Sequence, residues 1–167
     1  MAADPPLRDA GLAHLHARAV LAIARAADPI EPEAGRRLVA QVEARSGRPV
    51  SLDDLLLAEP LDPAELAAQL RAQAGPFRGA GLHPSELAAM IIQDSVAVAL
   101  GKGHVSEEEA RELVRFGVAL GCSVDDVRRM SEHLAPFLAA LDEAIEISAP
   151  APRPRRAARS GARSRSA

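Results

Sequence analysis

The sequence predicts an all-α protein of about seven helices, and three observations support this fold class. Of the 167 residues, 48% are hydrophobic but only 2% are aromatic, so a core has to be built from Ala, Leu, Val and Ile. This composition favours helices packed through small side chains over a β-sandwich. Apolar residues recur at three- and four-residue spacing along most of the chain. No segment alternates apolar and polar residues for long enough to predict a strand.

Four helices are predicted to begin at a small polar residue that is followed three positions later by an acid. Such a pair can cap a helix, because the first side chain accepts from a free backbone N–H and the acid reaches back to the cap. The capping positions are Ser51, Asp62, Ser106 and Ser123. Together with the apolar spacing, these starts predict helices at 7–27, 32–46, 52–58, 63–74, 84–100, 107–120 and 124–147.

Glycine and proline residues predict where these helices end. Pro136 is expected to bend or split the last helix. Four glycines each follow a helical segment and are expected to take the left-handed conformation that ends a helix, namely Gly47, Gly75, Gly101 and Gly121.

The chain contains an internal repeat at a spacing of 75 residues. Residues 21–39 align without a gap with residues 96–114, and the aligned pairs include Ile30 with Val105. Each unit is expected to form a long helix, a turn with one inward aliphatic residue and two further helices. Chance similarity between Ala- and Leu-rich helices is the alternative, but the matched turns favour a repeat because composition does not fix where a turn falls. The two units span about residues 13–58 and 86–134 of one domain at 1–147.

The turns and helix junctions of both units share a residue pattern. The first unit carries it at Ile30, Gly47 and Ser51–Asp54, and the second at Gly103, Val105, Glu109, Gly121 and Ser123–Asp126. This pattern resembles the TerB-like family of tellurite-resistance-associated helical domains. The resemblance implies an all-helical fold and a role in the response to metal oxyanions or envelope stress.

The chain departs from this family at the acids of its turns. The family's turn aspartate falls on Ala27 in the first unit and on Lys102 in the second, and its glutamate falls on Ala34 and Glu109. If family members hold a divalent cation with these acids, this chain lacks most of the ligands, and Lys102 repels a cation at the second turn.

A candidate metal site nevertheless lies beside the second turn. His104 precedes a predicted helix that opens with three glutamates, so His104, Glu108 and Glu109 could together bind a divalent metal ion. The alternative is a loop histidine next to acids that complement the dipole of their own helix.

The formal net charge of −3 is an average over two opposed parts of the chain. Residues 148–167 hold six arginines and no acid, so residues 1–147 carry 14 basic and 23 acidic residues, a net charge of −9. The tail at 148–167 is too poor in apolar residues to fold and is predicted to be disordered. Its arginines could bind nucleic acid or an anionic membrane surface, fold back on the acidic body, or have no selected role; they are Arg153, Arg155, Arg156, Arg159, Arg163 and Arg165.

No arrangement of residues predicts an enzyme or a bound cofactor. The chain has no Glu-x-x-His pair, no phosphate-binding loop and no strand before its Gly-x-Gly segments. The single cysteine, Cys122, is expected to be a small packing residue. His14 and His16 lie on different sides of a helix, so they cannot chelate together, and either could be a surface or interface residue.

Three hypotheses for the function follow. The first is a non-catalytic interaction or adaptor protein that binds a protein partner and could form homo-oligomers. The second is a protein that binds nucleic acid or an anionic surface through its tail, and the third is a divalent-metal sensor. Because the N-terminus lacks the basic start and apolar run of a signal peptide, we expect a cytoplasmic location.

Overall fold

The fold is all-helical. The computed structural model describes residues 6–26, 29–72, 81–99 and 101–131, which form seven helices and no strand. The predicted fold class is therefore confirmed. The helices are α1 (Ala10–Ala24), α2 (Pro32–Ser46), α3 (Leu52–Leu57), α4 (Pro63–Ala72), α6 (Pro84–Ala99), α7 (Glu107–Ala119) and α8 (Val124–Ser131).

The predicted helix starts are capped as expected. At the start of α7 the Ser106 hydroxyl accepts from the backbone N–H of Glu109, and the Glu109 carboxylate accepts from the N–H of Ser106. Ser123 and Asp126 exchange the same two hydrogen bonds at the start of α8. Ser51 caps α3 in the same way through its hydroxyl. These local contacts satisfy backbone donors that the first turn of a helix leaves free. The helices therefore begin where the capping residues predict.

Helix α6 ends at Ala99, before Gly101 as predicted, but the left-handed conformation expected of Gly101 was wrong. Gly47 and Gly121 take the left-handed conformation, with φ of 68° and 87°, but in the turn before α7 this conformation belongs to Gly103. Gly101 serves a different purpose, because a Cβ atom there would lie 3.1 Å from the Ala34 Cα atom of α2. Close approach of two backbones, rather than a positive φ, favours glycine at this position.

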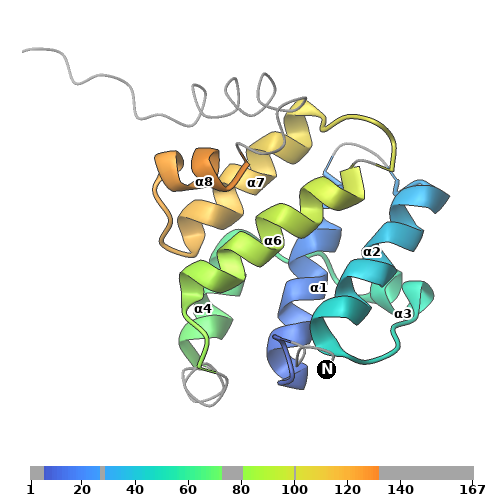
Figure 1. Cartoon of the computed structure of the whole chain (residues 1–167), viewed down its shortest axis with the longest axis horizontal. Helices are drawn as coiled ribbons and strands as arrows, with labels where there is room; N and C mark the ends of the chain where they lie inside the picture. Colours follow the sequence, from blue (N-terminus) through green and yellow to red (C-terminus); the bar gives the residue numbers. More distant parts are fainter. Residues whose placement is uncertain (1–5, 27–28, 73–80, 100, 132–167) are drawn as a thin grey trace, which may run out of the picture.

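Helices α1 and α6 pack against each other at the centre of the fold, with α2 and α3 on one side and α4, α7 and α8 on the other (Figure 1). The two central helices make corresponding contacts. Helix α1 contacts α2, α3 and α7, and α6 correspondingly contacts α7, α8 and α2. Helix α4 lies outside this pattern and packs against α7 and α1.

The core consists almost entirely of aliphatic and small side chains, as the composition predicts. Its largest fully buried member is Phe116 of α7. The aligned turn residues Ile30 and Val105 both pack against this core, Val105 with only 7% of its surface exposed. The prediction of one inward aliphatic residue in each turn is confirmed.

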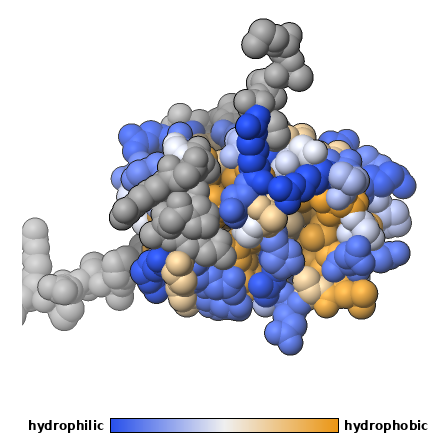
Figure 2. All heavy atoms as spheres, turned by 90° about the horizontal axis from the view of Figure 1, so that it is seen from below, coloured by the Kyte–Doolittle hydropathy of each residue, from blue (hydrophilic) through white to orange (hydrophobic). Residues whose placement is uncertain are grey.

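The described surface is mainly hydrophilic, but Figure 2 shows hydrophobic atoms reaching it between the charged side chains. Two large hydrophobic side chains stand out there, Leu57 at 84% exposure and Val118 at 49%. No helix among the described residues is long and apolar enough to cross a membrane. The predicted extension of the last helix from 132 to 147, the stop at Gly75, the bend at Pro136 and the tail at 148–167 lie outside the described residues.

Candidate functional site

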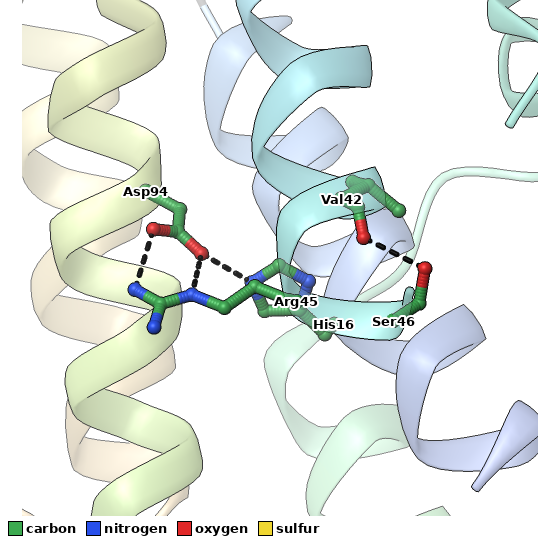
Figure 3. Close-up of polar contacts among 5 residues, drawn as sticks. All are labelled: His16, Val42, Arg45, Ser46 and Asp94. Atoms are coloured by element: carbon green, nitrogen blue, oxygen red, sulfur yellow. Dashed lines mark hydrogen bonds and ion pairs between the residues drawn. The ribbon is translucent and has the colours of Figure 1, made fainter. Parts of the chain in front are cut away.

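Three helices bring His16, Arg45 and Asp94 together into a buried charge network (Figure 3). The Nε2 atom of His16 in α1 lies 2.8 Å from Oδ2 of Asp94 in α6. Arg45 in α2 donates to the same carboxylate from one edge of its guanidinium, from Nε to Oδ2 at 2.9 Å and from Nη2 to Oδ1 at 2.8 Å. One carboxylate thus joins the three longest helices through a two-point bond of the kind that makes Arg–carboxylate pairs strong.

The environment of Asp94 keeps its carboxyl group ionised. Burial raises the pKa of Asp94, but the hydrogen bonds from His16 and Arg45 and their charges outweigh it, so the pKa lies below its ordinary value. The same pair raises the pKa of Arg45 through its hydrogen bond to Asp94, against the opposing effect of burial. Arg45 and Asp94 therefore form an ion pair at neutral pH.

The histidine–aspartate pair is placed for structure rather than for reaction with a substrate. His16 is fully buried and Asp94 is 2% exposed, so neither reaches solvent. A general base must lie within hydrogen-bond reach of the proton that it abstracts. Two buried polar atoms have no hydrogen-bond partner among the described residues. They are Nδ1 of His16 and the hydroxyl of Ser95, the residue after Asp94.

No motif in the sequence predicts this network. A surface or interface position for His16 is wrong, because α1 is buried around most of its circumference and His16 is fully buried. His14, two residues earlier, is exposed as expected. The available signal was Asp94, an acid that lies between the apolar runs at 87–92 and 96–99 of α6, since a buried carboxylate requires a partner. The partner itself is 78 residues away and no local pattern identifies it.

The three candidate metal ligands at 104–109 do not form a cluster. The buried carboxylate of Glu109 receives Nζ of Lys102 at 2.7 Å on one oxygen and the Ser106 N–H at 2.8 Å on the other. His104 lines a cavity of about 130 Å³ beside this ion pair, whereas Glu108 lines a different cavity between α1 and α7. Within the described residues no three His, Cys, Asp or Glu side chains are placed to hold a metal ion.

Cys122 is buried and free, in agreement with its expected packing role. Burial and then the nearby charge of Asp126 raise the pKa of its thiol above the ordinary value. A thiol in this state is a poor nucleophile.

A cavity of about 530 Å³ opens between α1, α7 and the segment that leads into α4. Buried Leu21 and Leu61 contribute apolar surface to it, whereas charged side chains contribute the rest. Its charged lining residues comprise four arginines and three acids, a net charge of +1. The arginines are Arg18, Arg25, Arg111 and Arg115, and the acids are Asp62, Glu108 and Glu112.

An apolar groove of about 640 Å³ adjoins this cavity, and Asp62, Pro63 and Arg115 line both. It runs between α4, α7 and the start of α8. Most of its lining is aliphatic or small, from Pro63, Ala64, Ala67, Val114, Val118, Ala119 and Val124, and Arg71 completes it. Neither cavity was predicted, because their walls come from segments about 50 residues apart in sequence.

Comparison of the chain with family models, curated proteins and solved structures gave no match. The resemblance to the TerB-like family therefore stays a prediction. The proposed tail contacts through Arg153, Arg155, Arg156, Arg159, Arg163 and Arg165 also stay predictions, because these residues lie outside the described part of the chain.

Proposed function

We propose that this chain is a non-catalytic recognition module that holds an apolar helical segment of a protein partner in the groove between α4, α7 and α8. The observation that carries the proposal is the exposure of Val118 in this groove. Val118 is 49% exposed, although α7 buries Leu113, Val114 and Phe116 almost completely. Grooves of this kind bind the apolar face of an amphipathic helix.

The charges at the groove indicate which charge the partner helix carries beside its apolar face. Arg71 is exposed at the end of α4 and makes no ion pair with any described residue, and Arg115 lies on the opposite wall. Only Asp62 opposes them with a negative charge, and it already accepts from Arg115 at 3.4 Å. A helix with acidic residues beside its apolar face complements this arrangement.

The buried networks support a binding role rather than a catalytic one. Glu109 and Asp94 each have both carboxylate oxygens in hydrogen bonds or ion pairs with other residues of the chain. His16 is fully buried in the core. The groove and the neighbouring arginine cavity, by contrast, are open to a partner. The link to metal oxyanions or envelope stress rests on the TerB resemblance alone.

The test places a photo-crosslinking amino acid in the full chain at position 118 or, as a control, at position 57. Leu57 is the matched control, because it is the other large exposed hydrophobic residue of the described surface and does not line the groove. We expect a protein that crosslinks from 118 but not from 57. Binding of that purified protein should weaken at least tenfold, by about 1.4 kcal/mol, in Val118→Asp and stay unchanged in Leu57→Asp.

Other occupants of the groove give different results and overturn the proposal. A second copy of the chain would show as a dimer that Val118→Asp converts to a monomer. A segment of the same chain would show as an intramolecular crosslink from 118 and a melting temperature that falls more in Val118→Asp than in Leu57→Asp. Equal crosslinking from both positions also counts against the groove.

A further inference from the structure

We infer that the cavity between α1 and α7 binds a small monocarboxylate with an apolar body, and that the Arg25 guanidinium holds the carboxylate. The site is adjacent to the groove proposed above but does not depend on it. Its volume of about 530 Å³ lies within the range of ordinary small-molecule sites.

Arg25 is the arginine of this cavity that has a free guanidinium. It follows the last residue of α1, is exposed, and makes no side-chain hydrogen bond or ion pair with any described residue. Its backbone N–H donates to the carbonyl oxygens of Leu21 and Ile23 at the end of α1, so the base of the side chain has a fixed position. An arginine held at its base and free at its tip can form the two parallel bonds that a carboxylate accepts.

The other three arginines have protein partners. Arg111 bonds to Glu107 at 3.2 Å, and Arg115 bonds to Glu112 and Asp62. Arg18 donates from Nε and Nη2 to the backbone carbonyl of Glu59, at 3.3 and 3.0 Å. Since a carbonyl carries no net charge, only Glu65, 3.8 Å away, offsets the charge of Arg18. Arg18 therefore adds positive potential beside Arg25.

The charge and the walls of the cavity select the class of ligand. Its arginines exceed its acids by one, which matches a monoanion better than a phosphate dianion. Glu108 has no hydrogen bond or ion pair among the described residues, so it repels an anion in the cavity. Ala22, Ala26 and Pro60, which are only partly buried or exposed, provide apolar surface for the body of the ligand.

The test is a titration of the full chain, labelled with ¹⁵N and followed by NMR at constant ionic strength. The probes are hexanoate, its neutral analogue hexanamide, and inorganic phosphate. We expect saturable shifts of residues at the cavity with hexanoate and much weaker binding of hexanamide and phosphate. Binding without any partner protein distinguishes this site from the groove, so either proposal can fail alone.

Three variants locate the ligand. Arg25→Gln should weaken hexanoate binding about tenfold, and Glu108→Gln should strengthen it several-fold because a repulsive charge is removed. Arg36→Gln is the control, since Arg36 is also exposed but pairs with Glu33 on α2, away from the cavity. A gain of affinity in Glu108→Gln cannot come from misfolding.

The inference is overturned by any of three outcomes: no saturable shift with hexanoate, binding of hexanamide or phosphate as tight as that of hexanoate, or equal effects of Arg25→Gln and Arg36→Gln.

Discussion

The Nε2 atom of His16 lies 2.8 Å from the Oδ2 atom of Asp94, and neither side chain reaches solvent. This contact joins α1 to α6, the helix pair at the centre of the fold. The bidentate bond from Arg45 extends it to α2.

Loss of the carboxylate should destabilise the protein strongly. Asp94→Ala leaves His16 buried without its partner and should lower the free energy of unfolding by about 3–5 kcal/mol. Joint replacement by His16→Leu, Arg45→Met and Asp94→Leu should cost less, since it leaves no unpaired charge in the core. Denaturant unfolding measures both. The control, Glu33→Ala, removes an exposed pair and should change stability by less than about 1 kcal/mol. A larger loss in the triple variant than in Asp94→Ala would contradict this account.

Acid should remove the contribution of Asp94 to stability. The pKa of Asp94 in the folded protein lies below its unfolded value of about 3.9. The carboxylate therefore makes its full contribution to the free energy of unfolding at pH values well above about 3.9. This contribution declines as pH falls from there through the folded pKa, because the unfolded state then binds the proton more readily. We expect the stability difference between the natural protein and Asp94→Asn to shrink as pH falls below about 4. A difference that stays unchanged down to pH 2 would argue against the ionised network.

Gly117 should not tolerate a side chain. A Cβ atom there would lie 2.5 Å from Cγ2 of Val127 in α8, and the branched valine side chain has little rotamer freedom to move away. Gly117→Ala should therefore destabilise the protein by about 1–3 kcal/mol, despite the better helix propensity of alanine. Thermal or denaturant unfolding tests this.

Two further variants test whether the loss of stability in Gly117→Ala comes from the contact with Val127. Val127→Ala in the Gly117→Ala background should recover part of the loss. Gly35→Ala should cost less, because the atom it meets at 2.7 Å is the flexible end of half-buried Leu52. Absence of rescue by Val127→Ala would show that the contact is not the cause.

Divalent metal should not stabilise the turn before α7. Both oxygens of Glu109 are bound within the protein, and the Lys102 ammonium occupies the place where a cation would bind. We expect no change in melting temperature with millimolar calcium or zinc. A rise that is lost in His104→Ala would restore the metal-sensor hypothesis.

The same ion pair predicts a ranking of variants at this turn. Ser106→Ala removes one capping hydrogen bond and should cost about 1 kcal/mol. Glu109→Ala removes the reciprocal bond and leaves Lys102, whose side chain is 18% exposed, without its partner. It should therefore cost more than Ser106→Ala in the same unfolding experiment.

The sequence alone determined the helices of the described part of the chain, because their signals are local. The capping pairs span three residues and the apolar spacing spans one or two turns, so α2 begins and ends at the predicted positions, 32 and 46, and α7 differs by one residue. The aliphatic composition likewise determined a core of closely packed small side chains.

Only the tertiary structure decided which polar residues meet. His16, Arg45 and Asp94 lie on three helices, and the 75-residue repeat places apolar residues, Ile91 and Ala19, at the positions that correspond to His16 and Asp94. Helix packing also decides three other features. It brings the backbone at Gly101 close to that of α2, it forms the walls of the two cavities, and it places Lys102 in an ion pair with Glu109. Caps and periodicity fix the conformation of neighbouring residues, whereas a site forms from residues that only the packing of distant helices brings within hydrogen-bond distance.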